Sequence, residues 1–346
     1  MKNKILFIGD PHLKINRFDL VLQFLSWLNK VIAEVKPDVV VNLGDTFDTH
    51  AILRSEVLCE FMNHVDHVVG LGIDYVYLLG NHDMYKPNDA KYHALRPFKG
   101  RIPKFHVIDE VVEMFGMTFV PYQHNPDNFP RKTLPVCVAH QTMLGADYGA
   151  IRASDGVPPS SITGCELLIS GHIHTRQRIV SPTKTGPEVL YVGSPFSQSA
   201  ADVDQIKGIT LFDLSTYGET LYPAPLPSWR RLRVVVSQQT TLEHVQQMID
   251  LDVKGSKDHW VLELEGPKAE IVGYLGSKQY INSVQNVDVK VKTTFTDKEK
   301  KKLSIEAKSM ESIISDYVVK VYSGSLDKTK LLEVAKSVLN GSKLSK

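Results

Sequence analysis

The chain has 346 residues, 42% of them hydrophobic and 23% charged, which is typical of a globular protein with two or three domains. The formal net charge of +1 excludes a uniformly basic molecule, so any nucleic-acid contact must come from local patches. The three cysteines have no metal-binding spacing, and the sequence carries neither an export signal nor an apolar run long enough for a membrane helix, so we expect a cytoplasmic protein.

Apolar strand patterns alternate with helical patterns in the first part of the chain. Strands are predicted at residues 4–8, 39–41 and 75–79, and helices at residues 18–35 and 56–69. This βαβαβ order predicts a largely parallel sheet with helices on its faces. A second, mixed sheet is predicted from strand patterns at residues 118–120, 136–139, 167–170, 189–192 and 209–212. The expected fold is α/β, a two-sheet sandwich flanked by helices.

A proline-rich stretch from Leu221 to Pro227 predicts a stiff linker between domains. We expect a first domain at residues 1–221 and a small α+β capping domain at residues 228–295. Residues 296–346 carry two apolar stripes at helical spacing and are expected to form C-terminal helices, arranged as a hairpin.

Polar clusters follow five of the predicted strands, at the edge where open α/β sheets bind ligands. We expect one group of metal ligands there, composed of Asp10, His12, Asp45, Asn81, His140, His172 and His174. Four imidazoles, two carboxylates and an amide suit Mn, Fe or Zn better than Mg. Two such ions, with Asp45 as the bridging carboxylate, would bind a phosphate and lower the pKa of a water molecule toward neutrality. The pattern therefore predicts a two-metal phosphoesterase.

His82 follows a predicted ligand directly, and we expect it to contact the phosphoryl oxygen or to protonate the leaving oxygen. Asp48 could orient the His82 ring. His50 could line the same cleft, although a surface-loop histidine is the better interpretation. Any one of these histidines alone would more often be a structural polar residue, whereas the ordered set of motifs after strands is specific.

Candidate DNA contacts are fewer and less specific. Arg176 and Arg178 follow the GHIH motif and could bind phosphates, or could belong to a solvated face. Trp229, Arg230 and Arg231 could stack on and grip DNA, or could lock the linker to the second domain. Both alternatives stay open at this point.

These motifs resemble those of the calcineurin-like metallophosphoesterase superfamily and, within it, the SbcD branch of bacterial and phage DNA repair nucleases, the counterpart of the meiotic-recombination nuclease. The likeness to that branch rests on GDTFDT at residues 44–49, YVGSP at residues 191–195 and the Trp-Arg-Arg run at residues 229–231. A small module and C-terminal helices follow, as in the family. The motif match covers about residues 5–200, and beyond residue 228 the likeness is one of layout.

The resemblance implies two metal sites, with manganese as the usual metal. One ion would be held by Asp10, His12, Asp45 and His174, and the other by Asp45, Asn81, His140 and His172. The resemblance also implies that His82 is the catalytic histidine and that DNA is the substrate, cut endonucleolytically on single strands and by a 3′-to-5′ exonuclease on duplex ends. The implied partner is an SbcC-like SMC-type ATPase docked on the C-terminal helices, with a homodimer within a heterotetramer.

Two other functions remain as alternatives. One is another phosphoesterase of the superfamily, such as a protein phosphatase or a nucleotide phosphodiesterase; the phosphatases of the superfamily carry GDxxDRG, whereas Thr49 and His50 follow Asp48 here. The second is a scaffold that has lost catalysis. A substituted ligand would mark such a scaffold, and all seven predicted ligand positions are intact.

Overall fold

The computed structural model describes residues 2–48, 50, 53–149, 151–180, 186–237, 240–296 and 329–330. The chain divides into two compact units, residues 1–296 and residues 297–346. Nearly all of the predicted C-terminal hairpin lies outside the described residues, and so it stays a prediction.

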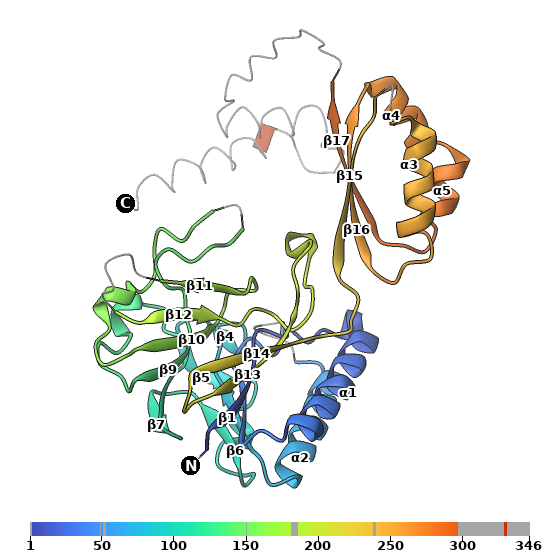
Figure 1. The fold of residues 1–346 in the computed structure, drawn as a ribbon. Helices are drawn as coiled ribbons and strands as arrows, with labels where there is room; N and C mark the ends of the chain where they lie inside the picture. Colours follow the sequence, from blue (N-terminus) through green and yellow to red (C-terminus); the bar gives the residue numbers. More distant parts are fainter. Residues whose placement is uncertain are drawn as a thin grey trace. The chain divides into compact units, whose positions relative to one another are not determined.

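Six strands form the first sheet, in the order β14-β13-β1-β2-β3-β6 (Figure 1). The bounds are β1 (Lys4–Ile8), β2 (Val39–Asn42), β3 (Asp74–Leu78), β6 (Phe105–Ile108), β13 (Gly208–Asp213) and β14 (Gly218–Pro223). Strands β1, β2, β3 and β6 run parallel. Strand β13 runs antiparallel to β1, and β14 extends the sheet antiparallel to β13. Helices α1 (Phe18–Val35) and α2 (Ser55–Gly70) cover one face of this sheet, as the helical patterns predicted.

The second sheet also has six strands, in the order β11-β12-β10-β9-β8-β7. The bounds are β7 (Val112–Met114), β8 (Met117–Val120), β9 (Val136–His140), β10 (Leu167–Gly171), β11 (Gln177–Ile179) and β12 (Glu188–Tyr191). The four inner strands run parallel, and β7 and β11 are short antiparallel edges. A mixed second sheet was predicted, but the strand expected in it at residues 209–212 is wrong: it pairs with β1 and forms β13 of the first sheet.

The core forms because successive side chains of a strand point to opposite faces. In β1, Leu6 and Ile8 pack against α1 and α2, whereas Ile5 and Phe7 pack between the two sheets. Both faces of the parallel strands are therefore buried, which explains their unbroken apolar runs. The outer face of the second sheet is covered by loops between residues 143 and 162. The expected sandwich is confirmed, with helices flanking the first sheet in the described part of the chain.

Beyond β14 the chain forms a separate three-stranded parallel sheet, in the order β15-β16-β17. The bounds are β15 (Trp229–Val235), β16 (His259–Gly266) and β17 (Val289–Phe295). Figure 1 shows α3, α4 and α5 gathered on one face of this sheet. These helices span Leu242–Met248, Lys268–Leu275 and Lys278–Ser283, and a π-helical turn at Ile249–Val253 follows α3. Helices α4 and α5 were not predicted from the sequence, because helices of about two turns contain too few residues to show a clear helical periodicity.

The other elements are short. A hairpin is formed by β4 (Met84–Lys86) and β5 (Asp89–His93). Single 3₁₀ turns lie at Ile15–Arg17, Arg96–Phe98, Pro126–Asn128, Pro159–Ser161 and Ala200–Asp202. Strand β14 reaches Pro223, two residues past the predicted end of the first domain. No helix among the described residues is both long and apolar enough to cross a membrane.

A histidine is buried where α2 packs against the first sheet. The side chain of His64 is 2% exposed, and its Nδ1 lies 2.6 Å from the Oδ1 of Asn29 on α1. Burial lowers the pKa of His64 to about 3. The folded state therefore keeps this ring neutral, whereas the unfolded chain takes up a proton near the ordinary histidine pKa.

This difference predicts a pH-dependent contribution to stability. It is fully present above the unfolded pKa near 6.5 and is lost as the pH falls from there toward 3. Between pH 7 and pH 5, the wild type should lose about 2 kcal/mol more of its free energy of unfolding than His64→Gln. Urea unfolding at both pH values measures this. His67→Gln, at an exposed position of the same helix, is the control, and equal losses in wild type and His64→Gln would contradict the prediction.

Candidate metal centre

Parallel strands from both sheets end at the same place. Asp10, Asp45 and Asn81 follow β1, β2 and β3 of the first sheet, while His140 ends β9 and His172 follows β10 of the second sheet. The register of the paired parallel strands places their carboxyl ends at the same edge of each sheet. The polar residues that follow these strands therefore lie close together. The seven predicted ligands form two groups of neighbouring donor atoms.

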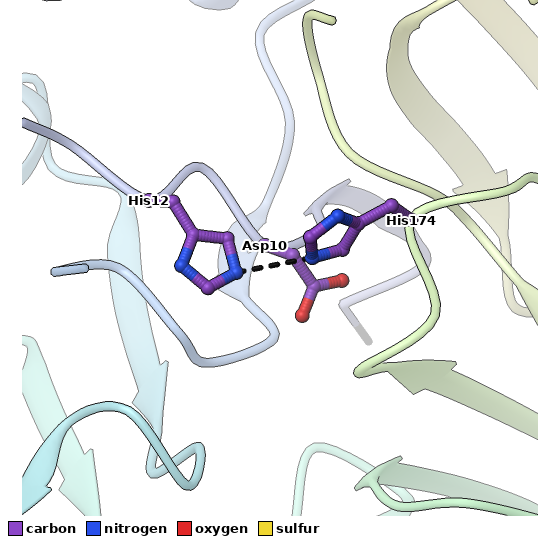
Figure 2. Close-up of side chains that lie close together, drawn as sticks. All are labelled: Asp10, His12 and His174. Atoms are coloured by element: carbon purple, nitrogen blue, oxygen red, sulfur yellow. Dashed lines mark hydrogen bonds between the residues drawn. The ribbon is translucent and has the colours of Figure 1, made fainter. Parts of the chain in front are cut away.

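The first group contains Asp10, His12 and His174, whose candidate ligand atoms all lie within 4.8 Å of one another. Figure 2 shows a ring nitrogen of His12 directed at a ring nitrogen of His174, beside the Asp10 carboxylate, and the two Nε2 atoms are 3.1 Å apart. Asp10 Oδ1 accepts a hydrogen bond from the main-chain N–H of His172 at 2.7 Å. Asp10 Oδ2 is buried and has no hydrogen-bond partner among the described residues. A buried carboxylate oxygen of this kind suits a cation.

The second group contains Asp45, His140 and His172, joined by the amide of Asn81. Asn81 Oδ1 lies 2.9 Å from His172 Nδ1 and 3.1 Å from His140 Nε2. The Nδ1 atom of His140 lies 2.7 Å from the carbonyl oxygen of Leu43. Nδ1 of His140 therefore carries a proton and donates it to that carbonyl, which leaves Nε2 directed at the group.

Asp45 lies between the two groups. Its Oδ2 atom is 3.3 Å from His140 Nε2 and 3.8 Å from His12 Nε2, one histidine from each group. Its Oδ1 atom accepts a hydrogen bond from the main-chain N–H of His82 at 2.7 Å. The carboxylate thus faces both groups while its other oxygen is fixed by the backbone.

The charges of the two groups depend strongly on one another. Burial alone would lower the pKa of His140, yet the nearby carboxylates of Asp45 and Asp10 raise it to about 9. Burial would raise the pKa of Asp45, but His140, His12 and His82 lower it well below its usual range. A proton on His140 therefore neutralises Asp45 when only protein groups are present.

Four of the predicted ligands have an unusual backbone conformation. The φ angles are 32° at Asp10, 42° at His12, 48° at Asp45 and 81° at His172. Side chains disfavour this left-handed region, and such residues persist only where the surrounding structure holds them. Gly80 shows how tightly the centre is packed, since a Cβ atom there would lie 2.3 Å from Asp45 Oδ1.

Asp83 holds the turn that carries Asp45, and sequence analysis missed it. Its buried carboxylate accepts main-chain hydrogen bonds from Asp45 at 2.9 Å, Thr46 at 3.0 Å and Gly80 at 2.9 Å. Burial and the Asp45 carboxylate raise the pKa of Asp83 to about 6, and the amide donor of Gly80 opposes this shift. The signal was present in the sequence, because an acidic residue directly follows the Gly-Asn-His of the third motif.

His82 lies at the edge of the centre and contacts Asp48 through the backbone. The Nδ1 atom of His82 is 3.1 Å from the carbonyl oxygen of Asp48. The Asp48 carboxylate, expected to orient this ring, instead lies 2.7 Å from Lys14 Nζ and 3.5 Å from His12 Nδ1. His50, interpreted from the sequence as a surface-loop residue, stacks on His82 with ring centroids 4.5 Å apart. The His82 ring is thus held by a carbonyl and a second imidazole.

The predicted DNA contacts are engaged within the protein. Arg176 pairs with Glu219 at 2.8 Å, and Arg178 pairs with Glu188 and with Glu219. These side chains are neither unpaired nor fully exposed, so phosphate binding would require the pairs to open.

The three residues of the Trp-Arg-Arg run also contact other residues of the protein. Trp229 is 3% exposed and stacks on His259, so its ring does not offer a face for a base in this arrangement. Arg230 pairs with Asp258 at 3.1 Å, and Arg231 pairs with Asp204 at 3.3 Å. These contacts support the alternative in which the run locks the linker in place, whereas its contact with DNA stays a prediction.

The centre opens into a cavity of about 210 Å³. Its described lining consists of His12, Lys14, Asp45, Asp48, Asn81, His82, His172, His174 and Gln198. Buried carboxylates, imidazoles and an amide, with an unpartnered Asp10 oxygen, form a donor set that suits divalent metal ions. The residues present therefore fit divalent metal ions.

The role of Asp83 yields a test. In Asp83→Asn, one of the two oxygens becomes an NH₂ donor that faces main-chain N–H groups, so at least one buried donor loses its partner. We expect the free energy of unfolding to fall by about 2 kcal/mol in the presence of a chelator. Urea unfolding measures the change. Asp127→Asn, at an exposed position, is the matched control, and an Asp83→Asn protein as stable as this control would contradict the assignment.

Comparisons with known proteins agree with this geometry. Residues 3–176 match the family model described as calcineurin-like phosphoesterase. The chain is 31% identical over 264 residues to “Putative phosphoesterase 244L” of Invertebrate iridescent virus 6, which covers 69% of this chain and 88% of that protein. It is 23% identical over 245 residues to “Exonuclease subunit 1” of Enterobacteria phage T4, covering 66% of this chain and 70% of that protein.

A solved dimetal phosphatase from Danio rerio is also similar, with 12% identity and a TM-score of 0.35 over 62% of this chain and 93% of that chain. A similarity at this level carries no argument about activity. The family model spans half of this chain, and the iridescent virus relative is matched over most of its length. The chain therefore belongs to the calcineurin-like phosphoesterase family, whose fold and donor cluster imply divalent metals.

Proposed function

We propose that this phosphoesterase is a manganese-dependent DNA nuclease that hydrolyses phosphodiesters with two metal ions. The observation that carries the proposal is the pair of donor groups that meet at the Asp45 carboxylate. Asp10, His12, Asp45 and His174 would hold one ion, and Asp45, Asn81, His140 and His172 would hold the other. The donor set suits Mn, Fe or Zn, and the choice of Mn among them follows from the family resemblance.

Divalent ions bound at this centre would supply Lewis acidity toward the phosphate and a lowered pKa for water. Proton transfer and orientation of the reacting groups would fall to side chains of the protein. The bond between His82 Nδ1 and the Asp48 carbonyl leaves Nε2 as the nitrogen that can exchange a proton with substrate. Stacking on His50 keeps the ring in one orientation. We therefore assign proton transfer to the leaving oxygen, or a hydrogen bond to the phosphoryl group, to His82.

Two features support a diester substrate over a phosphomonoester. No arginine occurs among the described residues that line the cavity, which include one lysine, Lys14. A guanidinium would be suited to grip the terminal oxygens of a monoester in bidentate fashion. The similarity to a phage exonuclease subunit points the same way. Another calcineurin-like phosphoesterase activity, on phosphoproteins or nucleotides, is the alternative.

The proposal includes the wider role inferred from resemblance. The protein would serve as the nuclease subunit of an SbcCD-like recombination and repair complex, with single-strand endonuclease and 3′-to-5′ exonuclease activities. An SbcC-like ATPase would dock on the segment from residue 296 onward, most of which lies outside the described residues. The homodimer, the DNA contacts of the capping domain and the cytoplasmic location likewise stay predictions.

A direct assay tests the substrate. Purified protein, with and without an SbcC-like ATPase, is given single-stranded and linear duplex DNA in Mn²⁺ or in Mg²⁺, and p-nitrophenyl phosphate in parallel. We expect DNA cleavage in Mn²⁺ and little turnover of the monoester. Asp45→Asn, prepared identically, controls for contaminating nucleases. Good monoester turnover without DNA cleavage would refute the nuclease proposal and favour the alternative.

The role of His82 has a separate test. His82→Ala should retain both ions, because the side chain lies outside the seven proposed ligands, and should lower the cleavage rate about 10²- to 10⁴-fold through loss of proton transfer. Metal content by mass spectrometry and single-turnover cleavage measure the two effects. His67→Ala, on the exposed side of α2, is the control. Loss of metal in His82→Ala would show that His82 has been assigned the wrong role.

A further inference from the structure

A lysine and an aspartate form a buried ion pair behind the first metal group. The side chains of Lys207 and Asp202 are 6% and 5% exposed, and Lys207 Nζ lies 2.6 Å from Asp202 Oδ1. Burial of two charges costs free energy that is recovered only when good geometry and further hydrogen bonds satisfy both groups. The other hydrogen bonds of the pair therefore identify the segments that it holds in place.

The lysine is bonded to the chain segment of one proposed ligand. Lys207 Nζ donates to the main-chain carbonyl oxygen of His174 at 2.7 Å, and the N–H of Ser194 donates to the same oxygen at 3.0 Å. Lys207 directly precedes β13, which pairs antiparallel with β1. Lys207 is thus positioned by β13, the neighbour of the strand β1 that leads to Asp10. From there its hydrogen bond holds the loop that carries His174.

The aspartate is bonded to the loop that reaches the other two members of the group. Asp202 Oδ2 accepts hydrogen bonds from the N–H groups of Gln198 at 2.8 Å and Ser199 at 3.1 Å. The side chain of Gln198 lines the metal cavity and donates from Nε2 to the carbonyl oxygen of Pro11 at 3.0 Å. Pro11 stands between Asp10 and His12 in the chain. Through Gln198, the ion pair is connected to both residues.

We propose that Lys207 and Asp202 are positioning residues for the metal ion bound by Asp10, His12 and His174. The pair connects the loops of three of the four proposed ligands of this ion, and none of its described hydrogen bonds goes to Asp45, Asn81, His140 or His172. Its effect is therefore selective for one of two neighbouring ions. This role rests on the proposed two-metal function, since it requires that both ions bind.

The test is manganese binding to the metal-free full-length protein. In Lys207→Met, one ion should bind as in the wild type and the other at least 10-fold more weakly, within the 10- to 100-fold range of outer-shell substitutions at metal sites. Calorimetric titration with Mn²⁺ measures both affinities. Electron paramagnetic resonance with two equivalents of Mn²⁺ should show a coupled Mn pair in the wild type and an increased mononuclear signal in the variant. Lys207→Arg, which keeps charge and donors, should restore the coupled signal.

Further variants separate positioning from general damage. The double variant Lys207→Met with Asp202→Asn leaves no unpaired buried charge, and Gln198→Ala alters a half-buried residue, so both should fold and both should weaken the same ion. Lys99→Met, which removes a partly exposed lysine paired with Asp109, should bind both ions normally.

The outcomes are distinguishable. Equal weakening of both ions in the Lys207 and Gln198 variants, or wild-type binding of both, would overturn the positioning role while leaving the proposed function intact. A wild-type protein that binds fewer than two ions would contradict the proposed function and this role with it.

Discussion

Carboxylates and imidazoles must be buried within a few ångströms of one another at this centre, and that constraint shapes the structure around them. Asp10 and His140 are fully buried, and Asp45 is nearly so. The carboxylates of Asp45 and Asp10 raise the pKa of His140 to about 9. Because an imidazole nitrogen binds a metal only without its proton, metal binding and proton release would be coupled at this site.

The scaffold meets this constraint with main-chain donors and strained turns. Asp83 gathers the N–H groups of the Asp45 turn, and His82 and His172 direct their own N–H groups at Asp45 and Asp10. The left-handed φ angles at the ligands show that the local backbone is held by its surroundings. Two sheets with both faces of their parallel strands buried provide the rigidity that such strain requires.

The same architecture leaves one side of the centre accessible. The cavity exposes His82, Lys14 and Gln198 beside the donor atoms, so a phosphate could approach the centre while most of the carboxylate oxygens stay covered. The three groups are held by different means: His82 by a carbonyl, Lys14 by the Asp48 carboxylate and Gln198 by the loop around Asp202. The His82 ring is thus held by groups outside the proposed metal ligands, whereas the loop that holds Gln198 is also connected to Asp10 and His12 through Pro11.

Sequence alone determined the sandwich, the first two helices and the seven donors that the structure brings together, because strand and helix periodicities are local and each donor lies at or within a few residues of a strand end. The partners of individual side chains were decided only by tertiary structure. Asp48 turns its carbonyl rather than its carboxylate to His82, and Arg176 meets Glu219, 43 residues away in the chain. Such contacts depend on how distant loops pack against one another. The sequence could therefore place the ligands, while their supports, Asp83 and the Lys207 ion pair, emerged only from the folded arrangement.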